Sequence, residues 1–234
     1  MNKLKDFLDN IDTALMDDNK ILQFEKYYEM LIEKNRVMNL TAITDRDEVI
    51  LKHFIDSAAL LKFHRLSDER IIDVGTGAGF PGIPLKIICP GLKVTLFDSL
   101  NKRVGFLNEV IDELGLFGIE AVHGRAEEGG RDKSMRETYD IAVSRAVANM
   151  AVLSEYCLPF VKTGGYFIPY KAYEIEDELN EGKKAVSILG GKLERVEKLD
   201  IEGNGRSIIF IKKEKLTPKA YPRKAGTAKK QPLI

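Results

Sequence analysis

Residues 71–84 read IIDVGTGAGFPGIP and hold four glycines and two prolines in fourteen positions. A strand that ends near Asp73, a loop with Gly75, Gly77 and Gly79, and a helix that starts at IPLKII predict a bare loop at the carboxyl end of a strand. Glycine adopts positive φ angles and has no Cβ, so a ligand can approach the backbone N–H groups of this loop. Because open α/β sheets bind ligands at this edge, we expect a ligand site here.

The glycine spacing and one acidic residue narrow the ligand. The pattern is G-x-G-x-G rather than the G-x-G-x-x-G of dinucleotide-binding loops, and no Gly-Lys-Ser/Thr follows, so a ligand without a pyrophosphate is favoured. Asp98 ends the apolar run KVTLFD, 19 residues past Gly79, where its carboxylate can accept both ribose hydroxyls of an adenosine ligand. This position suits NAD and S-adenosylmethionine equally well. A purely structural tight turn is the alternative.

Short apolar runs alternate with helical patterns after residue 70. These runs are RIIDV, KVTLFD, IEAVHG, YDIAVSRA and GYFIPY. The alternation is typical of a parallel sheet with crossover helices. Two further runs, LERVEKLD and RSIIFIKK, are joined through IEGNG, which contains hairpin-turn residues. We therefore predict an α/β fold with five parallel strands and an antiparallel end.

The two ends of the chain have different textures. Apolar residues recur at helical spacing between residues 4 and 32 and are interrupted near MDDN, which predicts two amphipathic helices. A third helix is expected after AITD, where Thr44 or Asp45 can cap it and Glu48 can complete a capping box. The last segment, TPKAYPRKAGTAKKQPLI, has three prolines, no acidic residue and no periodicity, so we expect an irregular arm.

Composition limits the class of protein. The 234 residues fit one α/β domain, and 36 basic residues balance 36 acidic ones, although residues 212–234 carry eight basic residues against one acidic. Cys89 and Cys157 are the only cysteines and both have apolar neighbours, which argues against a disulfide framework or a metal cluster. With no run long enough for a signal segment or bilayer span, we expect a cytoplasmic protein without membrane contact and without a metal.

The segment GRAEE follows the third predicted strand, where Ala126 and Glu127 can border an adenine ring. The alternative is a solvated helix start, in which Glu127 and Glu128 interact favourably with the helix dipole. The terminal hairpin and the three leading helices favour methyl transfer over hydride transfer, because a dehydrogenase would ordinarily add a substrate domain after the sheet.

Seven segments together resemble the bacterial small-subunit ribosomal RNA guanine-N7 methyltransferase family, also called glucose-inhibited division protein B. They are NLTAIT (39–44), HFIDSAAL (53–60), DVGTGAGFPGIPLKI (73–87), FDSLNKRVGFLNEV (97–110), GRAEE (124–128), DIAVSRAVANM (140–150) and YPRKAGT (221–227). The resemblance extends from about residue 20 to the end of the chain. No one of these segments would suffice alone.

The resemblance implies a Rossmann-like class I S-adenosylmethionine-dependent methyltransferase with a mostly parallel seven-stranded sheet. In this interpretation residues 1–66 form a helical cap, 67–214 the methyltransferase core, and 215–234 a basic arm. The implied reaction is methyl transfer from S-adenosylmethionine to N7 of one guanine in the decoding-region loop of 16S rRNA. The implied partner is 16S rRNA within the 30S subunit or its precursor, and we expect a monomer without a stable protein partner.

The resemblance also implies site residues. The family's cofactor contacts correspond here to Gly75, Phe80, Ala126, Glu127 and Arg145. The general methyltransferase pattern adds Asp73, Gly77, Gly79 and Asp98 to the predicted cofactor site.

The predicted reaction does not require the protein to remove a proton from the base. Guanine N7 is an sp² nitrogen with a free lone pair and no proton to lose, so alignment matters more than a general base. Enzymes that methylate exocyclic amines tend to carry an Asn/Asp-Pro-Pro-aromatic motif after the fourth strand, where this chain reads SRAV. Enzymes that methylate a pyrimidine carbon need a cysteine nucleophile, and neither Cys89 nor Cys157 lies in a loop at the end of a predicted strand. This elimination favours a ring nitrogen, with Arg145 as a positioning residue.

Several residues are candidate RNA contacts. Arg145 can hold the guanine O6 edge or a phosphate, with a strand-end salt bridge as the alternative. Arg125 can do the same or form a surface ion pair. His53 and Asp56 share a helix face near Asn39, where they line a base pocket or tie the cap to the sheet; for His53 we favour the structural role.

The arm is a further candidate RNA contact. Its basic residues can neutralise phosphates. They are Lys219, Arg223, Lys224, Lys229 and Lys230, and Arg223 and Lys224 are the predicted RNA contacts among them. A solvated basic tail is the alternative.

Two other functions stay open at the level of the residues. A nicotinamide-dependent oxidoreductase would use the same glycine loop and Asp98. A non-enzymatic RNA-binding assembly factor would use the basic arm and keep the pocket without turnover.

Overall fold

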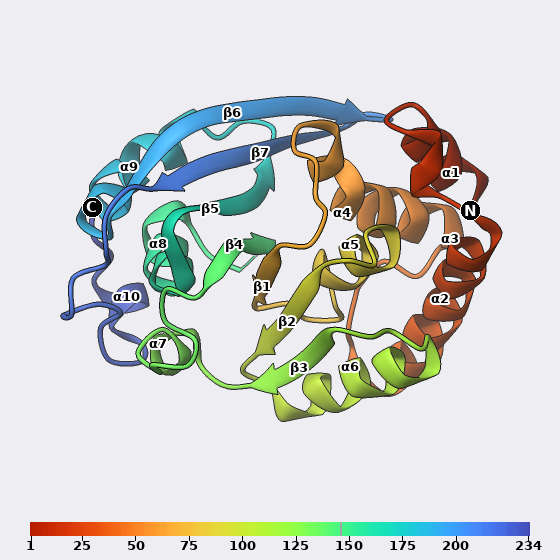
Figure 1. Ribbon diagram of the computed structural model, residues 1–234, viewed down its shortest axis with the longest axis horizontal. Coiled ribbons are helices and arrows are strands. Elements are labelled where there is room, and N and C mark those ends of the chain that lie inside the picture. The colour runs from red at the N-terminus through yellow and green to blue at the C-terminus, as the bar shows by residue number, and fades with distance from the viewer. Residues whose placement is uncertain (146) are drawn as a thin grey trace.

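A seven-stranded sheet crosses the middle of the computed structural model, which describes residues 1–145 and 147–234 (Figure 1). The strands are β1 (Arg70–Val74), β2 (Lys93–Asp98), β3 (Ile119–His123), β4 (Tyr139–Arg145), β5 (Val161–Ala172), β6 (Gly191–Ile201) and β7 (Asn204–Lys213). Their order is β3-β2-β1-β4-β5-β7-β6. β1 to β5 are parallel, whereas β7 is antiparallel to both β5 and β6, so the predicted strand pattern is confirmed.

The strand order reverses at β1. The chain passes from β1 to β2 and β3 on one side and then returns to β4 on the other side of β1. Such a switch point leaves a crevice outside the carboxyl ends of the central strands, because the connecting segments depart in opposite directions. The glycine loop follows β1 and therefore lies at this crevice.

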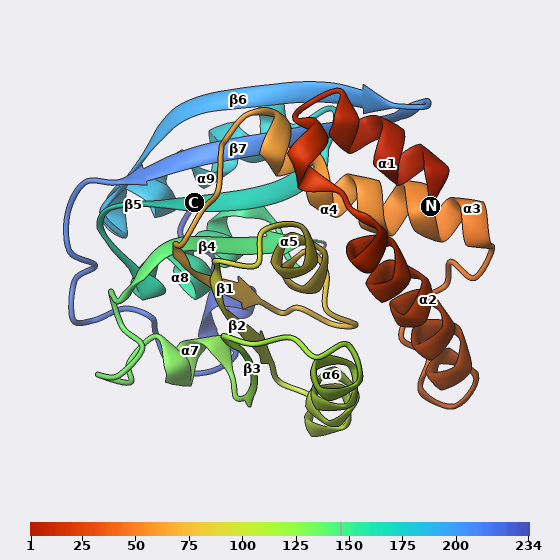
Figure 2. The ribbon, with the colours of Figure 1, turned by 45° about the vertical axis from the view of Figure 1, so that its right-hand side comes forward.

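Helices cover both faces of the sheet (Figures 1 and 2). On the core strands the helices are α5 (Gly82–Ile88), α6 (Asn101–Glu113), α7 (Ala126–Gly129), α8 (Met150–Cys157) and α9 (Glu176–Ile188). Successive side chains of a strand point to opposite faces. Accordingly, Ile71 packs with α5, α6 and the N-terminal helices, and Ile72 packs with α8 and α9. The central strands are mostly apolar because they are buried on both faces, and the buried Asp73 and Asp98 lie near their carboxyl ends.

The N-terminal cap consists of α1 (Asn2–Asp9), α2 (Asp18–Met38) and a third helical stretch. That stretch runs through α3 (Arg46–Val49), a π-helical segment at Ile50–Ile55, α4 (Asp56–Ala58) and a 3₁₀ turn at Ala59–Lys62. Its buried Phe54 lies in the same hydrophobic core as Tyr27 of α2 and Ile83 of α5. The cap and the sheet thus share one core. No helix of the described residues has the length and apolar character to cross a bilayer.

The predicted third helix begins at its acidic cap. The Asp45 carboxylate accepts a hydrogen bond from the Glu48 N–H at 3.0 Å, which satisfies one of the free donors of the first turn. The expected capping box is wrong in one respect, because the Glu48 carboxylate pairs with Lys52 one turn later. Asp45 and not Thr44 is the cap.

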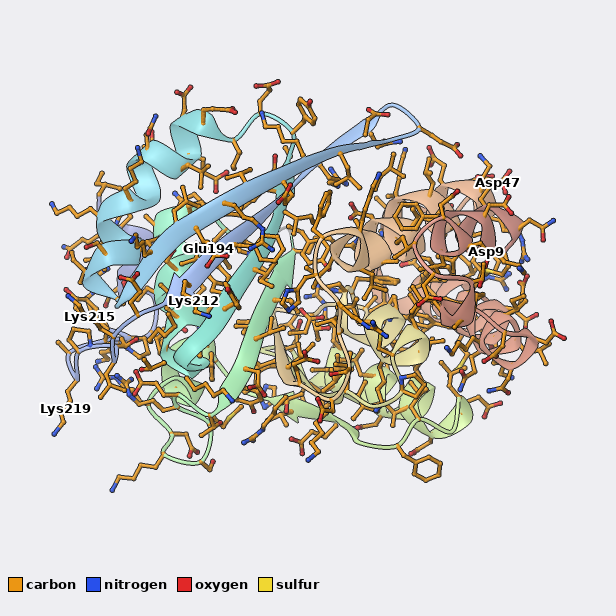
Figure 3. All side chains as sticks on the ribbon, turned by 45° about the horizontal axis from the view of Figure 1, so that its top comes forward. Asp9, Asp47, Glu194, Lys212, Lys215 and Lys219 are labelled. Carbon is orange, nitrogen blue, oxygen red and sulfur yellow. The ribbon has the colours of Figure 1, made fainter. Side chains whose placement is uncertain are left out.

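The segment after β7 runs back along the sheet to α7 and α8. Arg131 and Arg136 donate hydrogen bonds to backbone carbonyls between Thr217 and Pro222, and the chain then forms the short helix α10 (Thr227–Lys230). The predicted irregular conformation is confirmed for residues 215–226, but the last turn is helical and Ala228 is buried. Lys215 and Lys219 extend outward from this segment (Figure 3).

Asp45→Ala is expected to lower the free energy of unfolding by about 1 kcal/mol, because the first turn of α3 loses its capping acceptor. Thr44→Ala is the matched control, since Thr44 is equally exposed and its side chain makes no hydrogen bond within the described chain. Urea unfolding of both variants measures the difference. Equal stabilities of the two variants would contradict the assignment of Asp45 as the cap.

Candidate active site

The glycine loop reaches the end of β2 through its backbone. The Gly75 N–H donates to the Phe97 carbonyl at 2.8 Å, and the Gly77 N–H donates to the Asp98 carboxylate at 2.9 Å. Gly75 and Gly77 have φ angles of +72° and +64°, which strain any residue with a Cβ. A Cβ on Gly75 would lie 2.7 Å from Cγ2 of Val147. Around Gly77 there is open space within 4 Å, so a ligand can approach there.

Asp98 is buried and held in one orientation. Oδ2 accepts the Gly77 N–H and Oδ1 accepts the Leu100 N–H at 2.9 Å, and the Arg103 guanidinium lies 3.5 Å from Oδ2. An ionised carboxylate has about four acceptor sites, so both oxygens retain lone pairs for a ligand. The carboxylate therefore fits the pair of ribose hydroxyls predicted from the sequence.

Asp73 has a supporting position. Its Oδ2 accepts hydrogen bonds from Thr76 Oγ1 at 2.7 Å and from the Gly82 N–H at 2.8 Å, which ties both ends of the glycine loop to β1. Its Oδ1 is buried and has no partner among the described residues. Burial raises the pKa of this carboxyl to about 6. Asp73 lines neither pocket described below, so it shapes the loop from beneath.

Two adjoining pockets lie along the carboxyl ends of the strands. The first, the loop pocket, encloses about 1050 Å³ including its open mouth and is lined by residues that include Thr41, His53, Gly75, Gly77, Phe80, Asp98 and Arg145. The second, the arm pocket, encloses about 620 Å³ and is lined by residues that include Phe97, Arg125, Ala126, Glu127, Tyr156, Gly226 and Lys229. Gly75, Ser99 and Val147 line both, so the two pockets are adjacent, and together we call them the crevice.

Arg145 ends β4 at the loop pocket and is anchored to the cap. Nη1 donates to Asp56 Oδ2 at 2.7 Å and to the Lys52 carbonyl at 3.1 Å, and the guanidinium carbon lies 5.0 Å from the centre of the Phe80 ring. Asp56 is 1% exposed and also accepts from Arg206 on β7 at 2.6 Å. Each arginine occupies one oxygen of this buried carboxylate, so the loss of either arginine would remove a charge-assisted hydrogen bond from a buried oxygen.

His53 completes the wall of the loop pocket. Its ring stacks on Phe80 at 4.6 Å, Nε2 lies 2.8 Å from Thr41 Oγ1, and Nδ1 lies 3.3 Å from Nη2 of Arg145. Burial, with a smaller effect of Arg145, lowers the pKa of His53 to about 4. The ring is therefore neutral, and Nδ1 also lies 3.1 Å from the Lys52 carbonyl oxygen. His53 both ties the cap to the sheet and lines the pocket.

Comparison with known proteins gives the family. A family model described as rRNA small subunit methyltransferase G matches residues 20–209. The chain belongs to the rRNA small subunit methyltransferase G family. Among its relatives, the ribosomal RNA small subunit methyltransferase G of Desulforamulus reducens is 54% identical over 221 residues, covering 93% of this chain and 92% of the relative. That of Lachnoclostridium phytofermentans is 54% identical over 233 residues, covering 97% and 96%.

Solved structures support the predicted Rossmann-like methyltransferase fold. A SAM-dependent methyltransferase from Aquifex aeolicus superposes with a TM-score of 0.52 at 18% identity, covering 71% of this chain and 93% of that one. A precorrin-6y C5,15-methyltransferase from Geobacter metallireducens superposes with a TM-score of 0.52 at 17% identity, covering 68% and 88%. At such low identity these likenesses concern the fold alone.

Most residues predicted for the cofactor site of this family member lie around the crevice. Gly75, Gly77, Phe80, Asp98 and Arg145 line the loop pocket, and Ala126 and Glu127 line the arm pocket. Gly79 lines neither pocket. Its φ of +108° and the 2.7 Å that would separate a Cβ from the Tyr27 hydroxyl show that it serves the tight turn.

The predicted RNA contacts separate into two groups. His53 and Arg125 line the pockets, and Lys224 is exposed on the arm. Asn39 is the left-handed C-cap of α2 and lies outside both pocket linings. The Arg223 guanidinium donates to both oxygens of Glu155, a carboxylate that is 1% exposed, while 23% of the Arg223 side chain stays exposed. The phosphate contact expected of Arg223 stays a prediction.

Several lining residues escaped the sequence analysis. Thr41, Val147 and Tyr156 carry no chemical signature of their own, although Thr41 lies within the segment NLTAIT. Gly226 and Lys229 reach the arm pocket from the far end of the chain. Periodicity gives no warning of such contacts, because they depend on where the arm packs.

The neutral His53 predicts a specific pH response. Because its folded pKa of about 4 lies below its ordinary value of 6.5, its contribution to stability is complete above pH 6.5 and is lost as the pH falls toward 4. The difference in free energy of unfolding between wild type and His53→Gln should therefore shrink over that interval. Urea unfolding of both proteins at several pH values measures this difference. The titration of Asp73 contributes equally to both proteins and therefore cancels in the difference. A ring that titrates near 6.5 by NMR would contradict the assignment.

Proposed function

We propose that this chain transfers the methyl group of S-adenosylmethionine to N7 of a guanine in 16S rRNA. The observation that carries the proposal is the pair of adjacent pockets at the β1 switch point, with the fixed Asp98 carboxylate and the anchored Arg145 on the wall of the loop pocket. Membership of the rRNA small subunit methyltransferase G family supports both the reaction class and the RNA class.

The residues of the crevice fit S-adenosylmethionine. Asp98 offers lone pairs on both oxygens to the ribose hydroxyls, and the open space at Gly77 leaves the loop backbone accessible. The arm pocket offers Phe97, Ala126 and Tyr156 to the faces of an adenine ring. When bound, the cofactor supplies an electrophilic methyl group on a sulfonium. The loop spacing G-x-G-x-G, in place of the G-x-G-x-x-G that binds a pyrophosphate, favours this cofactor over NAD, which uses a similar acidic ribose acceptor.

The residues around the loop pocket suit attack by an unprotonated ring nitrogen. Guanine N7 has a free lone pair and no proton to lose, so the protein has to align the base more than to remove a proton. His53 is held neutral by burial, and both of its nitrogens are engaged within the protein. Cys89 follows the last residue of α5 and Cys157 ends α8, and both are buried. Burial raises the pKa of both thiols, that of Cys89 to about 11, which disfavours the thiolate that nucleophilic catalysis needs.

Arg145 acts in this proposal as the positioning residue for the target base. Asp56, the Lys52 carbonyl and the Phe80 ring fix one side of its guanidinium, and 13% of the side chain remains exposed. A guanidinium of fixed orientation donates in a defined plane, which matches the O6 and N7 edge of guanine or a phosphate. The anchoring reduces the entropy that is lost when the base binds.

The RNA approaches the open mouth of the crevice in this proposal. Arg125 lies at the mouth of the arm pocket, and Lys224 and Lys230 are exposed on the adjoining arm. These cations neutralise phosphates without reading sequence. We further propose that the substrate is the 30S subunit or its precursor, that the enzyme acts as a monomer, and that residues 1–66, 67–214 and 215–234 serve as cap, catalytic core and arm.

The reaction is tested with methyl-labelled S-adenosylmethionine and 30S subunits from a strain that lacks the gene for this protein. We expect label on one guanine of 16S rRNA, located by chemical cleavage at N7-methylguanine. Subunits from the parent strain are the control and should accept little label, because their site is already modified. Label on an exocyclic amine or a pyrimidine, or none under saturating cofactor, would contradict the proposal.

Arg145→Lys should lower turnover about 100-fold, because a lysine cannot keep the planar contact and the base is misaligned. Arg206→Lys is the matched control, since Arg206 pairs with the same Asp56 carboxylate but does not line the loop pocket. Single-turnover methylation and thermal unfolding are measured for both variants. Similar losses of stability with turnover lost only in Arg145→Lys support the role, and equal turnover contradicts it.

A further inference from the structure

The C-terminal arm, residues 215–234, reaches the cofactor crevice. Figure 1 shows α10 beside α7 and α8. Gly226 and Lys229 of the arm line the arm pocket together with Ala126 and Glu127. Ala228, between them, is 1% exposed and packs in the same hydrophobic cluster as α8. The arm is therefore part of the pocket wall.

An ion pair fastens the arm beside this pocket. Nε of Arg223 donates to Oε1 of Glu155 at 2.9 Å, Nη2 donates to Oε2 at 2.6 Å, and the Arg223 backbone N–H donates to Oε1 at 2.7 Å. Glu155 lies on α8 and is 1% exposed. Because a buried carboxylate is costly without its partner, undocking of the arm carries a substantial penalty at this point. A freely solvated tail would not place an arginine there.

A separate hydrogen bond joins the arm directly to Glu127, a residue of the proposed cofactor site. The backbone N–H of Gly226 donates to Oε1 of Glu127 at 2.9 Å, and Glu127 is 6% exposed. Glu127 opens the short helix α7 next to Ala126, and Tyr156 of α8 lines the same pocket. One oxygen of the Glu127 carboxylate thus holds the arm. This contact lies beside the arm pocket, where we place the adenine ring.

We propose that the arm is a wall of the cofactor site, so that S-adenosylmethionine binds tightly only when the arm is docked and in turn holds the arm in place. The inference rests on the proposed function, because it assigns the arm pocket to the adenine end of that cofactor. The coupling is reciprocal by thermodynamic necessity. The factor by which the docked arm raises the affinity for the cofactor is the factor by which bound cofactor raises the equilibrium constant for docking. The exposed lysines that we propose for contact with RNA phosphates, Lys224 and Lys230, lie on this same arm.

Two neighbouring lysines provide a matched comparison. Lys229 lines the arm pocket, whereas Lys230 is the next residue of α10, carries the same charge and is absent from the pocket lining. Both are exposed. The methylene chain of Lys229 can cover an apolar ring while its ammonium stays in water. Removing the Lys229 side chain therefore opens the wall without leaving a buried charge.

Isothermal titration calorimetry with S-adenosylmethionine and with S-adenosylhomocysteine tests the wall. Lys229→Ala should raise the dissociation constant about three- to tenfold, whereas Lys230→Ala should stay near the wild-type value. The double variant Glu155→Gln/Arg223→Gln, which releases the ion pair without stranding a charge, should raise it by about tenfold or more. Circular dichroism confirms that each variant is folded.

Hydrogen exchange of the full-length protein supplies a second readout. Saturating cofactor should slow exchange in peptides from residues 223–234 of wild type, with little change in the β6–β7 hairpin as the internal control. If wild type binds the cofactor while the variants bind it equally well and the arm gains no protection, the inference is overturned. If wild type binds neither ligand, the proposed function fails first, and the two failures are distinguished.

Discussion

The hydrogen bond from the Gly77 N–H to the Asp98 carboxylate is the contact on which the site depends. It joins the end of β1 to the end of β2 at the switch point, and it requires a backbone with positive φ at Gly77. The same bond orients Asp98 toward the crevice while Asp73 fixes the loop from below. Without this hydrogen bond the Asp98 carboxylate would no longer be held in one orientation at the loop pocket.

Asp56 extends this organisation from the sheet to the cap. One carboxylate joins the third helical stretch of the cap to β4 through Arg145 and to β7 through Arg206. The π-helical segment at Ile50–Ile55 sets His53 and Asp56 against the same arginine, and such segments are frequent at functional sites. The cap thereby contributes one wall of the pocket and the anchor of the positioning residue.

Local sequence predicted the fold well because its signals are local. Alternating apolar runs, the glycine loop, the Asp45 cap and the IEGNG turn each depend on a few neighbouring residues. The ion pair of Arg223 and the complete pocket lining could not be predicted in the same way, because they depend on distant contacts. Gly226 and Glu127 are 99 positions apart, and Arg223 and Glu155 are 68 apart, so only the packed chain brings them together. Basic composition alone does not distinguish an exposed arginine from one that faces a buried carboxylate.

The most direct test of the central claim is a crystal structure of the protein grown with S-adenosylhomocysteine. Our account predicts the ligand across the carboxyl ends of β1 and β2, with both ribose hydroxyls within hydrogen-bond distance of Asp98 and the adenine ring between Ala126 and Gly226. A ligand bound elsewhere, or a crevice closed by side chains while the ligand is saturating in solution, would contradict it.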